Sequence, residues 1–213
     1  MQRWNFHTHT TWCDGNNTVQ EMEDAAYALG FLGLGFSGHG YCPVSQEYCM
    51  TPEREAFYRQ DVLAQRERYQ GRMRIFLGLE LEAQDTRIFP PGMYDYLIGS
   101  LHYIEEGGVA YPMDDSVETL GRCIREGFGG DAYRLAEAFF ARSAMAICAR
   151  RPDIVGHFDL LARYNGQGRF FDEDSPRYQG IAIEAVREAA KTGAIFEVNS
   201  GALARGIPNR IYP

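Results

Sequence analysis

The order of the predicted elements indicates an α/β fold in which parallel strands close into a (β/α) barrel. Apolar strand-like segments alternate with helical segments six times along the 213 residues, and parallel strands need such crossovers. All five histidines fall at the carboxyl ends of predicted strands, at the end of the barrel where catalytic groups collect. No linker rich in Ser, Gly or Pro interrupts the chain, so we expect one domain over residues 1–213.

The composition excludes several classes of protein. A hydrophobic fraction of 45% argues against disorder, and a formal net charge of −8 argues against a broad nucleic-acid surface. No signal peptide and no apolar run of about 18 residues is visible, so we expect a cytoplasmic protein without membrane contact. The five cysteines are odd in number and lack CxxC spacing, which indicates reduced thiols.

The first predicted strand, Trp4–Thr10, carries His7 and His9. Side chains alternate along a strand, so both imidazoles project from one face and make half of a metal site. Asp14-Gly15 predicts a turn that folds its carboxylate back toward the two histidines.

Two helices and a buried strand follow. Thr18-Val19-Gln20-Glu21 has the form of a capping box, which predicts a helix to about Leu29. The apolar, glycine-broken segment 31–37 predicts a strand buried on both faces, and His39 follows it. Thr51-Pro52-Glu53 then predicts the start of a polar helix that runs to about residue 69.

The predicted strand 74–82 ends in two acids, Glu80 and Glu82, that face the same way. Glu80 follows the buried run directly and is the better metal ligand, possible also as a bridge between two ions. Glu82 either supports a ligand or is a bystander. The strand 94–99 leads into Ser100 and His102.

The second half repeats the alternation of helix and strand. Ser116 predicts the cap of a short helix through Arg125, and Asp131 that of a longer helix, 132–149. Residues 152–159 form a short predicted strand with His157 near its end, and Ser175-Pro176 opens a helix that Gly193 closes. Residues 194–198 form the last legible strand.

Imidazole and carboxylate groups gathered on one rim are suitable ligands for zinc, manganese or iron. Cys13 is better explained as a buried, inert thiol than as a soft ligand. Tyr103 and Asp159 each follow a predicted ligand histidine, and either could orient it or simply pack. If the substrate carries phosphate, we expect the contacts to come from Ser100, Arg163 and Arg205.

The motifs together resemble the PHP (polymerase and histidinol phosphatase) family, and most closely its histidinol-phosphate phosphatase branch. The resemblance covers the whole chain in order and rests on NFHTHTTWCDG, GFSGHG, GLELE, GSLHYI, PDIVGHFDL and FEVNSGAL. It implies a distorted, seven-stranded TIM-like barrel with two to three divalent ions of Zn, Mn or Fe.

The resemblance also implies the role of each ligand. His7, His9 and Glu80 would hold the first metal, and Glu80, His102 and His157 the second. Asp14 and His39 would serve the third, so that Glu80, Asp14 and His39 are the expected catalytic residues. The implied reaction is hydrolysis of L-histidinol phosphate, a small phosphomonoester, in histidine biosynthesis, through a hydroxide that bridges two metals.

One family motif is missing from the sequence. The family ends with Asp-x-His on a seventh strand, which completes the first and third metal sites, whereas this sequence ends at Pro213. We therefore expect a chain truncated before its last strand, with unpaired barrel edges through which it could self-associate. Two alternatives stay open: a PHP enzyme for another phosphomonoester or for nucleic-acid ends, and a catalytically impaired metal-binding module.

Overall fold

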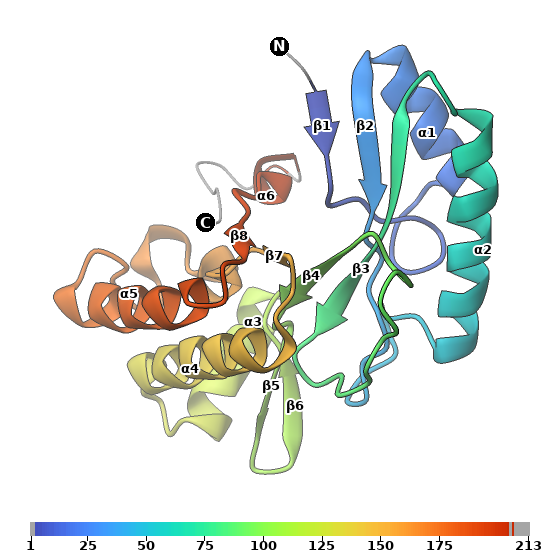
Figure 1. Cartoon of the computed structure of the whole chain (residues 1–213). Helices are drawn as coiled ribbons and strands as arrows, with labels where there is room; N and C mark the ends of the chain where they lie inside the picture. Colours follow the sequence, from blue (N-terminus) through green and yellow to red (C-terminus); the bar gives the residue numbers. More distant parts are fainter. Residues whose placement is uncertain (1–2, 205, 207–213) are drawn as a thin grey trace. The chain divides into compact units, whose positions relative to one another are not determined.

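The computed structural model describes residues 3–204 and 206 (Figure 1). Strands and helices alternate along the chain as expected, except over residues 74–112, where four strands follow one another without a helix. The α/β class expected from the sequence is confirmed. The chain packs as two compact units, one ending at Ile98 and the other beginning at Gly99. Across the described stretch, no helix is both long and apolar enough to cross a membrane.

The first unit is a parallel sheet with two helices. Its strands are adjacent in chain order, with β1 parallel to β2 and β2 parallel to β3. In Figure 1 both helices of this unit lie on the same side of these strands. The elements are β1 (Arg3–Asn5), α1 (Val19–Ala28), β2 (Phe31–Phe36), α2 (Pro52–Arg68), β3 (Arg74–Glu82) and the start of β4 (Tyr96–Ser100).

The opening strand is shorter than the sequence predicts. It ends at Asn5 rather than Thr10, and side-chain hydrogen bonds add to the backbone contacts of the residues that follow. The Asn5 carboxamide accepts from the amide of His7 at 3.0 Å, and the Thr8 hydroxyl donates to the carbonyl of Gly35 at 2.7 Å. His7 and His9 therefore belong to a loop that follows β1.

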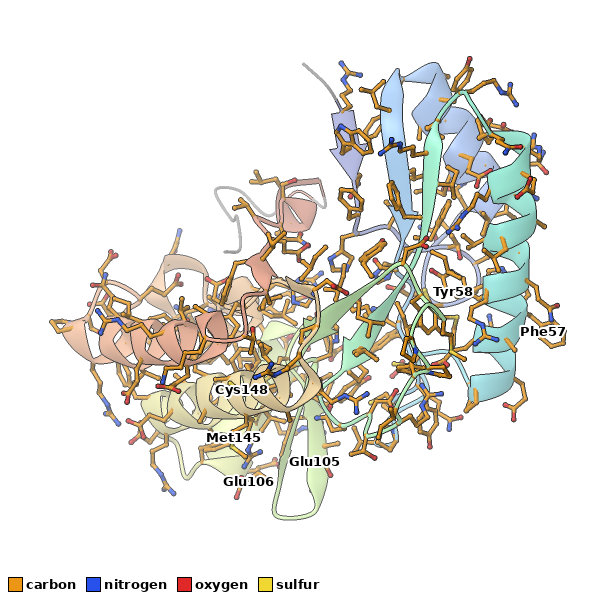
Figure 2. The ribbon with its side chains drawn as sticks, viewed as in Figure 1. Phe57, Tyr58, Glu105, Glu106, Met145 and Cys148 are labelled. Carbon is orange, nitrogen blue, oxygen red and sulfur yellow. The ribbon has the colours of Figure 1, made fainter. Side chains whose placement is uncertain are left out.

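Helix α2 packs its inner face onto the sheet. Tyr58 is fully buried and its hydroxyl donates to the carbonyl of Gly78 in β3 at 2.8 Å, whereas the adjacent Phe57 is 56% exposed. Figure 2 shows Tyr58 on the sheet side of α2 and Phe57 on the outer side. The helix begins as expected, with the Thr51 side chain accepting from the amide of Arg54 and Pro52 in the first turn.

The second unit contains most of the remaining helices. The end of β4 neighbours β7, which is parallel to β8, and α4 packs against α5 (Figure 1). Ser116, Asp131 and Ser175 cap helices as expected. The elements are α3 (Val117–Arg122), a π-helix (Cys123–Gly127), α4 (Ala132–Arg150), β7 (Ile154–Val155), 3₁₀ helices (Leu160–Tyr164 and Gly166–Gly168), α5 (Pro176–Ala190), β8 (Ile195–Phe196) and α6 (Gly201–Ala204).

The second unit also contains an antiparallel hairpin that the sequence analysis did not predict. Strands β5 (Tyr103–Glu106) and β6 (Val109–Pro112) are joined by two glycines with positive φ, which suit a tight hairpin turn. Arg142 of α4 fixes the hairpin, donating to the carbonyl of Glu105 at 2.6 Å and to the carboxylate of Glu106 at 2.8 Å. Figure 2 labels both acids on β5.

A buried acid lies on the inner face of α1. Glu23 is 0% exposed, and neither of its carboxylate oxygens has a hydrogen-bond partner among the described residues. Burial raises the pKa of Glu23 to about 7, against a smaller opposing effect of the positive charge on Arg68. The folded state therefore prefers the neutral acid.

We expect Glu23→Gln to stabilise the protein at alkaline pH. The pKa of Glu23 is higher in the folded state, so wild-type stability falls as pH rises from about 4.5 through about 7. The variant should gain about 1–2 kcal/mol near pH 8, allowing for solvent screening, and almost nothing near pH 4.5. Urea unfolding at both pH values measures the difference. Glu47→Gln, in an exposed loop, is the control, and a gain that does not depend on pH would contradict the prediction.

Candidate metal centre

The loop after β1 places His7 and His9 beside the end of β2. The amide of Ser37 donates to the carbonyl of Thr8 at 2.9 Å. On the other side, the hydroxyl of Tyr96 donates to the carbonyl of Phe6 and lies 3.2 Å from the carbonyl of Phe36. These bonds hold the loop backbone on both sides of His7.

Asp14 folds back onto His9, as the sequence predicts. The carbonyl of Thr10 accepts from the amides of Cys13 and Gly15, both at 3.0 Å, which closes a tight turn. A Cβ at Gly15 would lie 2.5 Å from the Thr10 nitrogen, so the turn requires glycine. The turn brings Asp14 Oδ1 to 2.7 Å from His9 Nδ1.

This contact changes the acidity of both partners. Burial raises the pKa of Asp14, but the hydrogen bond from His9 and the charges of His9 and His39 outweigh it and hold that pKa well below its usual value. Burial lowers the pKa of His9, but hydrogen bonds to Asp14, Cys13 and Glu80 outweigh it and raise that pKa well above 6.5. In the metal-free chain, the two groups therefore form an ion pair.

Glu80 is the focus of the first unit's polar cluster. The side chain is fully buried, and its Oε2 lies 3.3 Å from His7 Nε2, 3.2 Å from His9 Nε2 and 3.1 Å from His39 Nδ1. Three imidazole nitrogens thus converge on one carboxylate oxygen. His9, His39 and Glu80 can each offer one donor atom within 4.8 Å of the others, and the nitrogen and oxygen donors suit zinc, manganese or iron.

Backbone pairing positions His39 against Glu80. The two residues form a parallel bridge in which the amide of Glu80 donates to the carbonyl of Gly38 at 3.1 Å, and that of Gly40 to the carbonyl of Glu80 at 2.8 Å. Glu82 is also buried and faces the same way, with Oε1 3.3 Å from His39 Nδ1. The expected common direction of the two acids is confirmed.

In the second unit, His102 and His157 face each other. Their Nε2 atoms are 3.3 Å apart and both rings are largely buried. His102 follows β4 and His157 follows β7, as the sequence predicts. The sequence analysis missed Glu197, whose carboxylate accepts from the amide of His157 at 2.8 Å and from Asn199 at 3.0 Å. Its position directly after β8 matches the strand-end acids already singled out, and this signal could have identified it.

The three expected phosphate-binding residues have different surroundings. Ser100 is the last residue of β4 and is buried. Arg163 lies on a 3₁₀ helix and donates to Asp114 Oδ2 at 3.2 Å. Arg205 lies outside the described residues. A phosphate contact from any of the three stays a prediction.

Comparison with known proteins shows the family. A family model for the PHP domain matches residues 5–201, so the match spans both units and the chain belongs to the PHP domain family. The resemblance noted in the sequence is confirmed, and with it the α/β fold class of the PHP barrel type. A sequence search of curated proteins found no match.

Two solved structures share the fold of this chain. A putative histidinol phosphatase HisK from Listeria monocytogenes has a TM-score of 0.80 at 19% identity, covering 99% of this chain and 87% of its own. A histidinol phosphate phosphatase from Lactococcus lactis, complexed with zinc, L-histidinol and phosphate, has a TM-score of 0.62 at 19% identity, covering 93% and 73%. Family and neighbours support a metal-dependent phosphatase.

We expect Glu80→Gln to remove bound metal while leaving the fold intact. The amide cannot supply the anionic oxygen on which the three imidazoles converge, but it has nearly the same size. Metal analysis should show at least one ion fewer per chain than in wild type, with an unchanged circular dichroism spectrum. Glu47→Gln is the matched control, and full metal content in Glu80→Gln would sink the assignment of Glu80 as a ligand.

Proposed function

We propose that this chain is a metal-dependent phosphomonoesterase that hydrolyses L-histidinol phosphate to L-histidinol and phosphate. The observation that carries the proposal is the convergence of His7, His9 and His39 on one buried oxygen of Glu80. Membership of the PHP domain family and the fold shared with two histidinol phosphatases support the reaction class and the substrate.

The proposed ligands are the residues expected from the sequence. His7, His9 and Glu80 would hold one ion, with Asp14 and His39 beside them, and His102 and His157 would share another. Two to three ions of Zn, Mn or Fe are the proposed complement. The donors fit because they are nitrogen and oxygen atoms, and those of His9, His39 and Glu80 lie within 4.8 Å of one another. Such ions lower the pKa of a bound water and so supply a nucleophile at neutral pH.

The chain's own residues fix the donor atoms. Asp14 accepts from Nδ1 of His9, which leaves Nε2 of the same ring as the atom presented toward Glu80. Glu197 holds the backbone of His157 through its amide, which positions the ring without touching it. In both cases an acid sets the orientation of a histidine before any ion binds.

Phosphate recognition is assigned to Ser100, Arg163 and Arg205. Arg163 donates to Asp114 in this structure. It would therefore bind phosphate either while keeping that hydrogen bond or by giving it up for the phosphate oxygens. A small phosphomonoester fits the negative net charge better than a nucleic-acid strand does, since a strand needs basic residues along its length.

The proposal is tested by phosphate release from the metal-loaded wild-type chain. We expect turnover of L-histidinol phosphate with Mn, Zn or Fe, little turnover of other phosphomonoesters or of DNA ends, and a loss of at least about 100-fold in kcat for Glu80→Gln. Turnover of another phosphoester alone would contradict the substrate. A chain that binds metal tightly and hydrolyses no phosphoester would instead be a metal-binding module without catalytic activity.

A further inference from the structure

A second cluster of potential ligands shares His39 with the cluster around Glu80. Cys42 and Cys49 come from the loop between β2 and α2, and Glu82 is the last residue of β3. Cys42 is 0% exposed, Cys49 8% and Glu82 1%. All five cysteines of the chain are free thiols.

The donor atoms of His39, Cys49 and Glu82 lie close to the spacing expected in a tetrahedral zinc site. Cys49 Sγ is 4.0 Å and His39 Nδ1 is 3.3 Å from Glu82 Oε1, and the three residues offer donors within 4.8 Å of one another. Ligands 2.0–2.3 Å from a tetrahedral ion are separated by about 3.3–3.8 Å. The two printed separations approach these values, so small side-chain movements would let His39, Cys49 and Glu82 share one ion. Cys42, which is fully buried in the same loop as Cys49, would then be the fourth ligand.

The loop that carries the two thiols is held at both ends. The amide of Tyr41 donates to Glu55 Oε1 at 2.8 Å, and Glu55 is paired with Arg87. The amide of Met50 donates to the carbonyl of His39 at 3.1 Å. Cys42 directly follows the anchored Tyr41, and Cys49 directly precedes the anchored Met50. Less conformational entropy is therefore lost when both thiols bind one ion.

We propose that Cys42, Cys49, Glu82 and Nδ1 of His39 form a zinc site that is distinct from the cluster around Glu80. Two thiolates, one imidazole and one carboxylate match zinc in ligand type and in number, whereas the Glu80 cluster is built from nitrogen and oxygen alone. The site is closed by four protein ligands and buried, so its role is structural: it fastens the 41–50 loop to the end of β3.

The assignment has a consequence for His39. Its Nδ1 lies 3.1 Å from Glu80 Oε2 and 3.3 Å from Glu82 Oε1, and its Nε2 lies 3.9 Å from Asp14. With Nδ1 committed to the thiol site, the Glu80 cluster keeps His7 and His9 as its imidazole donors. His39 then faces Asp14 through Nε2, so that one ring connects the two clusters.

Cobalt substitution tests the proposal without any need for activity. We expect the reduced, metal-free wild-type chain to develop a thiolate-to-cobalt charge-transfer band in the near ultraviolet on titration with Co²⁺. Cys42→Ser and Cys49→Ser should each abolish that band, and each should lose one zinc per chain. Cys148→Ser, on the exposed surface of α4, is the matched control and should keep both the band and the zinc.

Cys13 is the main alternative source of a thiolate ligand, because it lies near His9 and Asp14 in another group of potential donors. A band that persists in Cys49→Ser but disappears in Cys13→Ser would overturn the proposal, as would the absence of any band in the wild type. A Cys42–Cys49 disulfide that survives reduction and metal loading would also overturn it.

A measurement on the wild type covers the case in which the serine variants fail to fold. X-ray absorption of the zinc-saturated chain should show sulfur neighbours at about 2.3 Å from zinc. Only nitrogen and oxygen neighbours would overturn the proposal. Phosphatase turnover is a separate readout: a sulfur-ligated zinc in a chain with no turnover refutes the proposed function and leaves this site standing.

Discussion

The parallel pairing of β2 with β3 is the constraint on which the candidate metal centre depends. The register sets Phe36 opposite Leu77 and continues into the bridge between His39 and Glu80. A shift of one residue would turn the carboxylate of Glu80 to the other face of the sheet, away from all three imidazoles. Hydrogen bonds of the backbone, rather than interactions between the site's own side chains, therefore decide which oxygen the histidines meet.

The apolar packing behind this register makes it rigid. Tyr58 ties α2 to the carbonyl of Gly78, two residues before Glu80, and Leu79 and Leu81 are buried on the side opposite to the acids. Because side chains alternate along β3, its leucines face the core and its carboxylates face the candidate metal centre. A carboxylate with no solvent contact is costly to bury, and its imidazole neighbours offset part of that cost.

Local signals in the sequence predicted the parts of the fold that local chemistry controls. Thr18, Thr51 and Asp131 each accept the hydrogen bond expected of a helix cap, because a cap depends only on a few adjacent residues. The placement of Glu80 after a buried strand was also predictable, since strand alternation and burial fix which way it faces.

Features that depend on distant partners were harder to predict. The loop that follows β1 is held by the bond between Thr8 and Gly35, which lies 27 residues away. Glu23 looks like a surface residue in sequence, and it is buried only because α1 packs against both β2 and α2. The position of Glu197 after a strand is visible in the sequence, but its role depends on a backbone amide 40 residues earlier in the chain. Such contacts leave no local pattern in a single sequence.

The ring of Tyr96 has an evolutionary consequence. Its hydroxyl reaches the carbonyls of Phe6 and Phe36, and the ring lies where a Cβ at Gly35 or at Gly78 would have to be. Side chains at positions 35, 78 and 96 would therefore compete for the same space. Among related sequences, Gly35 and Gly78 should vary together with Tyr96, so that a smaller residue at position 96 accompanies alanine or serine at the glycines. Such covariation would show how closely β2 and β3 approach the ring at position 96, independently of the metal ligands.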